Sequence, residues 1–223
     1  MNSTNRRVFL TKSVALACGA FLPVSVLTPV ATGKEPNPIQ NDLFDRMVWM
    51  NEPASWKKSA GKLFVRSRPK TDFWRKTASS EYIADNGHFF HLPVKGDFIF
   101  EARINGQYAA LYDQTGLMVR VDAENWAKCG TELIDGTRYA AVVFTREFSD
   151  GSTMNDLSPD QPVWWRVVRK GNSLETLCSL DGKIFTSVRQ GYLVPDRPAE
   201  VGIMCASPEG NGFDSVFDNL KLT

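Results

Sequence analysis

The sequence has few of the side chains that most often bind metals. Only two of its 223 residues are histidine and only four are cysteine. The two histidines, His88 and His91, are three positions apart. In a strand that spacing places them on opposite faces, where they make a poor chelate. We therefore expect no metal site, and no other cofactor motif is present.

An excess of charge of either sign is also missing. The chain has 26 lysines and arginines against 25 aspartates and glutamates, whereas proteins that bind nucleic acids usually carry a basic excess. Hydrophobic residues make up 43% of the chain, which is too many for a disordered protein. We expect a folded protein without a nucleic-acid partner.

Two common catalytic motifs are absent. The sequence contains neither the Gly-x-Ser-x-Gly turn of serine hydrolases nor a phosphate loop that ends in Gly-Lys-Ser or Gly-Lys-Thr. Gly210-Asn211-Gly212 begins like a dinucleotide-binding pattern, but it leads into an expected strand and is interpreted as a turn. Motifs alone therefore predict no particular reaction.

Only the N-terminus approaches the length of a membrane span. A paired arginine within Asn5–Lys12 precedes the mostly apolar stretch Val14–Val30, and no acidic residue comes before Glu35. This pattern resembles the twin-arginine export signal of bacteria. An uncleaved membrane anchor is the alternative, but Pro23 and Pro29 within the apolar stretch disfavour a spanning helix.

The expected organisation follows from that signal. We assign residues 1–32 to the export signal, residues 33–41 to a polar linker rich in proline and glycine, and residues 42–223 to one domain. The implied location is the periplasm or the exterior of the cell, with no membrane contact after the signal is cleaved.

Removal of the signal leaves three cysteines: Cys129, Cys178 and Cys205. An odd number excludes a fully paired disulfide framework, so the domain must be stabilised mainly by its core. We expect these three thiols to be buried. We also expect core positions for four aromatic residues: Trp164, Trp165, Phe98 and Phe100.

The dominant pattern in the domain has a period of two. Apolar side chains alternate along four segments, Phe98–Ile104, Leu117–Val121, Ala140–Phe144 and Val163–Val167, as expected for strands with one face against a core. Turn signals such as Asp135-Gly136 recur roughly every ten residues, and no long helical periodicity is present. The sequence predicts an all-β, antiparallel sandwich or barrel.

Several longer motifs resemble one known family. They are Trp49-Met50-Asn51-Glu52-Pro53, Thr71-Asp72-Phe73-Trp74-Arg75, the run from Tyr108 to Asp122, and Trp126-Ala127-Lys128-Cys129-Gly130-Thr131-Glu132. Together they resemble the domain-of-unknown-function 1349 family, which includes the fungal regulation-of-enolase-like proteins. The resemblance covers residues 45–222 and implies a jelly-roll sandwich of the concanavalin A-like lectin/glucanase type. The family usually carries an aromatic residue after the Ser-Asp near Phe148, where this chain has Gly151.

Alternation along neighbouring strands predicts a polar face opposite the core. Leu117, Val119, Ala127 and Cys129 are assigned to the core side. The outer face would then carry Arg120, Trp126, Lys128 and Glu132, with Trp126 as the expected stacking surface for a ligand. Residues in nearby loops or short strands would form the rim of this groove, namely Asp72, Trp74, Arg75 and His88. Tyr112 and Asp113 could either hold a turn or contact a ligand.

Aromatic rings beside carboxylates and arginines suit the recognition of sugars. We therefore predict an exported carbohydrate-binding protein with its groove on the concave sheet. A simpler interpretation is an Arg120–Glu132 ion pair across two strands, with Trp126 packed over it.

Two other functions remain open. One is a glycoside hydrolase in which Glu132 is the best catalytic candidate, with Asp122, Asp72 or His88 as its partner. However, the run of alternating acids that glucanases of similar fold place on one strand is missing. The other is a protein-interaction module without catalysis, for which a protein partner would be required.

Overall fold

The computed structural model describes residues 43–157, 161–194 and 197–223. These residues belong to one compact unit and form one short 3-10 helix, η1 (Leu43–Arg46), followed by strands alone. Within them, no helix has the length and apolar character needed to cross a membrane. The predicted export signal (1–32) and linker (33–41) lie outside the described residues.

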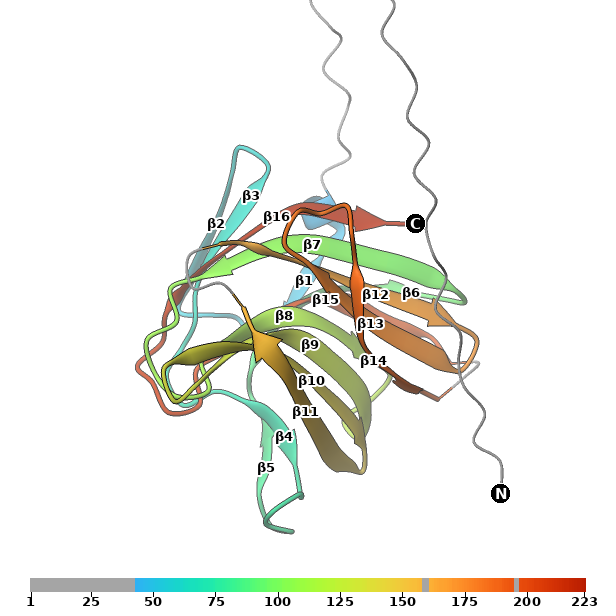
Figure 1. Ribbon diagram of the computed structural model, residues 1–223, viewed down its shortest axis with the longest axis horizontal. Coiled ribbons are helices and arrows are strands. Elements are labelled where there is room, and N and C mark those ends of the chain that lie inside the picture. The colour runs from blue at the N-terminus through green and yellow to red at the C-terminus, as the bar shows by residue number, and fades with distance from the viewer. Residues whose placement is uncertain (1–42, 158–160, 195–196) are drawn as a thin grey trace, which may run out of the picture. The chain divides into compact units, whose positions relative to one another are not determined.

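The strands form two large antiparallel sheets that pack face to face (Figure 1). Sheet 1 has the order β1 (Val48–Met50), β6 (His88–Val94), β15 (Ala199–Ala206), β8 (Gln114–Arg120), β9 (Asn125–Ile134), β10 (Thr137–Arg146) and β11 (Phe148–Asp156). Sheet 2 has the order β14 (Thr186–Tyr192), β13 (Ser173–Ser179), β12 (Val163–Lys170), β7 (Phe98–Gly106), β16 (Asp214–Leu222), β3 (Lys62–Arg66) and β2 (Ser55–Ser59). The predicted all-β antiparallel sandwich is confirmed, and it is consistent with a jelly roll of the concanavalin A-like type.

The core lies between the sheets and follows the predicted alternation. From sheet 1, Leu117, Val119, Ala127 and Cys129 are at most 2% exposed, and Trp165 of sheet 2 is fully buried in the same cluster. Cys129, Cys178 and Cys205 are also buried there, as predicted, and all three are free thiols. This layer of side chains holds the two sheets together by removing apolar surface from water.

One predicted core residue lies elsewhere. Phe98 and Phe100 are buried as expected, but Trp164 is half-buried and is absent from the cluster between the sheets. Because it neighbours Trp165 in a strand, its side chain points to the opposite face. There it packs against Gly182, where an added Cβ would lie 2.6 Å from the indole.

A short hairpin lies against the outer face of sheet 1. It consists of β4 (Phe73–Arg75) and β5 (Ile83–Asp85), and Figure 1 shows it beside β8 to β11, on the side away from sheet 2. Phe73 is fully buried and meets Trp126 edge to face, with 6.2 Å between the ring centroids. The hairpin therefore creates a second, smaller apolar cluster that also includes Met118, Val143 and Met204.

Two glycines face each other in the centre of sheet 1. Gly116 of β8 pairs with Gly130 of β9, and a Cβ on Gly116 would lie 1.9 Å from the carbonyl oxygen of Cys129. The backbones approach so closely that only glycine fits. As a result, no side chain rises from β9 between Lys128 and Glu132, which leaves the outer face open at that point.

Candidate functional site

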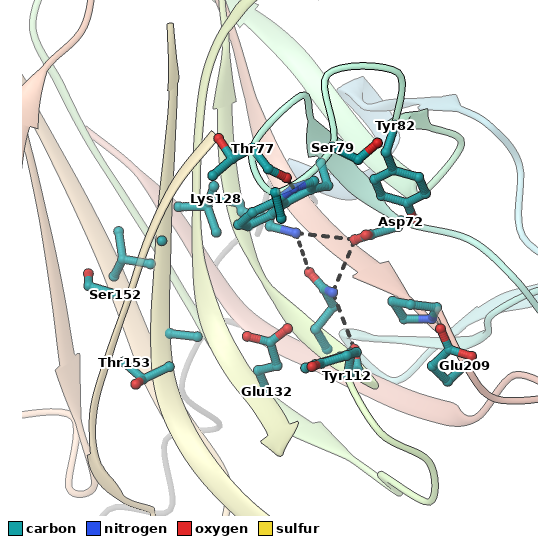
Figure 2. Close-up of a pocket in the computed structure, with 18 residues that line it drawn as sticks. Asp72, Thr77, Ser79, Tyr82, Tyr112, Lys128, Glu132, Ser152, Thr153 and Glu209 are labelled. Atoms are coloured by element: carbon teal, nitrogen blue, oxygen red, sulfur yellow. Dashed lines mark hydrogen bonds and ion pairs between the residues drawn. The ribbon is translucent and has the colours of Figure 1, made fainter. Parts of the chain in front are cut away.

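The hairpin covers only part of the outer face of sheet 1, and an open cleft lies between the hairpin and the rest of that face (Figure 2). Its volume is about 630 Å³, within the range of roughly 300–1,000 Å³ typical of small-ligand sites. The polar and aromatic residues that line it are Asp72, Trp74, Thr77, Ser79, Tyr82, Tyr112, Gln114, Lys128, Glu132, Ser152, Thr153 and Glu209. They come from the hairpin segment, from strands β8, β9 and β11, and from two loops.

Lys128 anchors the hairpin to the sheet at one end of this cleft. Its ammonium donates hydrogen bonds to the carbonyl oxygen of Phe73 (2.7 Å) and to Oε1 of Gln114 (2.6 Å), and it lies 3.4 Å from Oδ1 of Asp72. Gln114 in turn donates to Asp72 (3.3 Å) and to the carbonyl oxygen of Tyr112 (3.2 Å). Because Lys128 is only 7% exposed, these acceptors are needed to offset the cost of burying its charge.

Glu132 has different surroundings, although it projects into the same space (Figure 2). Among the described residues no group donates a hydrogen bond to its carboxylate, which faces the cleft from the end of β9. Burial raises the pKa of Glu132, and the nearby charge of Asp72 raises it further, while Lys128 acts in the opposite direction. Glu132 is therefore a carboxyl group with unused hydrogen-bonding capacity.

Three aromatic side chains form the walls. Trp74 of β4 is half-buried, and its indole N–H donates to the carbonyl oxygen of Thr77 (2.9 Å). Tyr82 and Tyr112 are 48% and 41% exposed. Burial, the charges of Asp72 and Glu209, and a hydrogen bond to Asp72 all raise the pKa of Tyr82. The cleft thus combines the faces of aromatic rings with negatively charged carboxylates.

Gly151 of β11 bounds the cleft beside the indole. A Cβ at this position would lie 3.5 Å from the ring of Trp74, which is ordinary contact distance. Because Gly151 has no side chain, it does not cover this edge of the Trp74 ring.

The structure brings together four of the eight residues predicted for the site. Asp72 and Trp74 come from the hairpin segment, and Lys128 and Glu132 come from β9. For Tyr112 and Asp113 the sequence left two roles open, holding a turn or contacting a ligand, and the structure gives each residue a different one. Asp113 accepts hydrogen bonds from two backbone amides and from Ser207, so it fixes a turn, while Tyr112 lines the cleft.

Trp126 and Arg120 lie on the outer face of sheet 1, as predicted, but other side chains cover them. Trp126 is 1% exposed because Phe73 packs on it, so the expectation that its ring stacks on a ligand is wrong. Arg120 forms two hydrogen bonds of 2.8 Å with Asp85 of the hairpin. The alternative Arg120–Glu132 ion pair is also wrong, since Arg120 lies opposite Trp126 and Glu132 lies opposite Gln114 at the far end of the strands.

Two predicted rim residues lie outside the cleft. Arg75 points away from it and pairs with Glu124. His88 is 1% exposed and uses both ring nitrogens: Nδ1–H donates to the carbonyl oxygen of Asn51 (2.6 Å), and Nε2 accepts from the amide of Arg68 (2.9 Å). Burial lowers the pKa of His88. Both residues therefore have structural roles in this conformation.

The sequence interpretation missed several residues of the site. Gln114 could have been found, because it precedes Gly116 and Met118 on the same face of β8, and extending the alternation by one step places it there. Tyr82 and Glu209 lie in loops, which have no periodicity to follow. No three of the His, Cys, Asp and Glu residues in the described ranges are grouped to hold a metal ion.

Fold and cleft together define a β-sandwich protein with a ligand-sized cleft outside one sheet. The chain belongs to the family described as "Protein of unknown function (DUF1349)", whose model matches residues 49–223. This result supports the resemblance noted from the motifs.

A curated relative is "Regulation of enolase protein 1" of Saccharomyces cerevisiae. It is 34% identical over 184 residues, which cover 82% of this chain and 92% of the relative. A solved structure of a functionally unknown protein from the same yeast is also 34% identical, with a TM-score of 0.77, and covers 81% of this chain and 97% of that one.

More distant structures share the fold. The GH43 protein BlXynB of Bacillus licheniformis has a TM-score of 0.58 at 15% identity, with 77% of this chain and 35% of that chain covered. The carbohydrate-binding module CBM66 of Bacillus subtilis has a TM-score of 0.51 at 12% identity, with 78% and 94% covered. At such low identity these similarities establish the sandwich fold and nothing about the ligand.

Proposed function

We propose that this protein binds a saccharide in the cleft between the hairpin and sheet 1. The observation that carries the proposal is the combination of exposed ring faces with hydrogen-bonding groups that the protein leaves unused. Tyr82, Tyr112 and Trp74 offer apolar surfaces to the C–H faces of a sugar ring. The free carboxylate of Glu132 can accept hydrogen bonds from sugar hydroxyl groups.

Fold similarity supports the same proposal at a coarser level. One structure with this fold is named a carbohydrate-binding module, and others are GH43 glycoside hydrolase proteins. A sandwich of this type is therefore known to occur in proteins that handle carbohydrates. Fold alone does not assign a function, so the argument depends on the residues of the cleft.

A glycan array with the purified mature domain tests the proposal. We expect at least one saccharide to bind, and the Tyr82→Ala variant to bind it about tenfold more weakly, because a partly buried ring contributes about 1–2 kcal/mol. Tyr192→Ala is the matched control, since Tyr192 is a tyrosine of similar exposure on β14 of sheet 2. Binding of no saccharide would refute the proposal and favour a protein partner.

One observation favours a second candidate, a glycoside hydrolase. Glu132 has a raised pKa, as a catalytic acid requires, and Asp72 lines the same cleft. Of the other partners considered, Asp122 pairs with Arg197 (2.7 Å) and His88 is buried elsewhere. If the protein is an enzyme, Glu132→Gln abolishes turnover of the bound saccharide and keeps binding. If it is a binding module, no turnover is found in either form.

We further propose that the protein is exported by the twin-arginine route to the periplasm or beyond. The support is the sequence pattern: an arginine pair at Arg6-Arg7, an apolar stretch after it, and no acid before Glu35. Changing Arg6-Arg7 to Lys-Lys should leave the precursor in the cytoplasm of fractionated bacterial cells. Normal export of that variant would refute the route.

A further inference from the structure

We propose that the ligand of this cleft carries a positively charged amino group, so that the protein prefers an amino-bearing saccharide to a neutral one and excludes an acidic one. This inference rests on the proposed saccharide site and names the chemical class that the site selects. Three observations carry it: the charges that line the cleft, the hydrogen bonds already used by its ammonium group, and its aromatic walls.

The charges facing the cleft are mainly negative. Asp72, Glu132 and Glu209 line it, and Lys128 is the cation that lines it among the described residues. Lys70 lies 3.4 Å from Glu209, but both side chains are at least 60% exposed, and water screens such a pair strongly. Lys76 and Arg75 are engaged with Glu147 and Glu124 outside the cleft. The carboxylates are therefore incompletely neutralised.

Lys128 has no hydrogen-bond donor left for a ligand. An ammonium group has three N–H donors, and those of Lys128 are directed to Phe73, Gln114 and Asp72. Its charge serves to hold the hairpin on the sheet. A carboxylate or sulfate on a saccharide would find no free cation among the described residues that line the cleft. It would also meet like charges at Glu132 and Asp72, which disfavours its binding.

Glu132 offers what an ammonium group needs. Its two oxygens accept no hydrogen bond from the described part of the protein, and hydrogen bonds between charged groups are roughly twice as strong as neutral ones. Tyr82 shows a smaller effect of the same charges: burial is the main reason that its pKa is raised, and the negative charges of Asp72 and Glu209 raise it further. An amino group bound beside Glu132 would relieve this repulsion between carboxylates.

The aromatic walls add to the same preference. Figure 2 shows Tyr82 and Tyr112 projecting into the space that Glu132 and Asp72 also face. Ring faces attract cations through their quadrupole. They also pack against the C–H faces of a sugar. An amino sugar is the class of saccharide that satisfies both the rings and the unpaired carboxylate.

Isothermal titration calorimetry with oligosaccharides of equal length tests the inference. The probes are a chitosan oligomer, a cello-oligomer and an oligogalacturonate, used at about pH 6, where most of the chitosan amino groups are protonated. We expect the chitosan oligomer to bind about tenfold more tightly than the cello-oligomer, with no binding of the oligogalacturonate. The advantage should decrease at high salt, because charge interactions are screened.

Two variants separate the charge of the site from the net charge of the protein. Glu132→Gln should remove most of the preference for the amine, whereas Glu175→Gln, with the same change on β13 of sheet 2, should leave it intact. Unchanged far-ultraviolet circular dichroism verifies folding of both. Equal or tighter binding of the neutral oligomer, or a preference that survives Glu132→Gln, would overturn this inference while leaving saccharide binding in place. Failure of the chitosan oligomer to bind would also overturn it, and the glycan array then decides the proposed function separately.

Discussion

The two carboxylates on either side of the cleft show how neighbouring residues acquire different roles. Asp72 accepts hydrogen bonds from the amide of Phe73 (2.7 Å) and from Gln114, and it lies within reach of Lys128. Glu132 accepts no hydrogen bond from any described residue, although the charge of Lys128 acts on it. Asp72 is therefore committed to holding the start of the hairpin, while Glu132 remains available to a ligand.

The raised pKa of Glu132 predicts a dependence of stability on pH. Burial raises the pKa of Glu132 in the folded state above the ordinary value of 4.5, which applies to the unfolded state. At pH values between the ordinary pKa and the raised pKa, the folded state therefore binds more protons than the unfolded state. The free energy of unfolding therefore decreases as pH rises through that window. Glutamine has no such charge to bury, so Glu132→Gln should increase the melting temperature at pH 7 relative to the native chain, with a smaller difference near pH 4.

Thermal unfolding followed at several pH values provides the measurement. Glu175→Gln, on the other sheet, is the control and should show no comparable change between pH 4 and pH 7. A lower melting temperature of Glu132→Gln at pH 7 would contradict the prediction, and it would mean that attraction to Lys128 outweighs the cost of burial.

Trp126 and Trp74 should respond differently to truncation. Trp126 is 1% exposed in the cluster beneath the hairpin, so Trp126→Ala should lower the free energy of unfolding by about 3–5 kcal/mol. Trp74 is half-buried and lines the cleft. Compared with Trp126→Ala, Trp74→Ala should therefore lower the free energy of unfolding less and weaken ligand binding more. Urea unfolding and saccharide titration of both variants measure this, and loss of binding without loss of stability in Trp126→Ala would refute it.

At the scale of elements, the hairpin decides which part of the sheet a ligand can reach. Alternation correctly predicted that Trp126, Lys128 and Glu132 share the outer face of β9, because that information is local. It could not show that the distant segment Phe73–Asp85 folds over one end of this face. Trp126 was therefore predicted to be accessible and is buried, whereas Glu132, at the uncovered end, lies in the cleft as predicted.

The same limit explains the errors at Arg120 and His88. Both have the polar groups of binding residues, yet both are used by the fold: Arg120 binds Asp85, and His88 binds the backbone of Asn51 and Arg68. Which polar side chains are consumed by long-range contacts is set by tertiary structure. Alternation of apolar and polar residues predicts which way a side chain faces only on a regular strand, so it could have identified Gln114 but not the cleft residues in loops.

Breaking the Arg120–Asp85 pair should loosen the hairpin. Asp85→Asn leaves the guanidinium of Arg120, whose side chain is 10% exposed, without its charged partner, at a cost of about 1–3 kcal/mol. We expect faster hydrogen exchange of the hairpin amides and weaker saccharide binding. Adding Arg120→Met should restore part of the stability, because no unpaired charge is then buried.

A matched control for that change is Asp45→Asn. Asp45 pairs with Lys58 at 2.7 Å, but its side chain is 71% exposed, so the loss should be small. If the hairpin amides of Asp85→Asn keep their native exchange rates, the pair does not hold the hairpin in place.

At the scale of the whole molecule, the two sheets share one core and should separate together. Leu117 and Cys129 from sheet 1 pack in the same cluster as Trp165 and Cys178 from sheet 2. A core of this kind is exposed only when the sandwich opens, since neither sheet covers its inner face alone. The cleft lies outside this layer, so ligand binding does not require the sheets to move.

The three free cysteines report this opening. Burial raises the pKa of Cys129, Cys178 and Cys205, and the thiolate is the form that reacts. Cys129 and Cys205 are at most 2% exposed, while Cys178 is 8% exposed. We therefore expect Cys129 and Cys205 to react with a thiol reagent at one common slow rate set by unfolding of the sandwich, and Cys178 to react faster.

Mass spectrometry after timed labelling measures the rate of each cysteine in the native protein. Denaturant should accelerate Cys129 and Cys205 in parallel with the unfolding transition, because both become accessible in the same event. A saccharide that binds only the folded state should slow both by the factor 1 + [L]/Kd, or about a hundredfold at a ligand concentration of 100 Kd. Fast native labelling of either residue, or rates for the two that diverge in denaturant, would show that sheet 1 opens in parts and that the sandwich is not one cooperative unit.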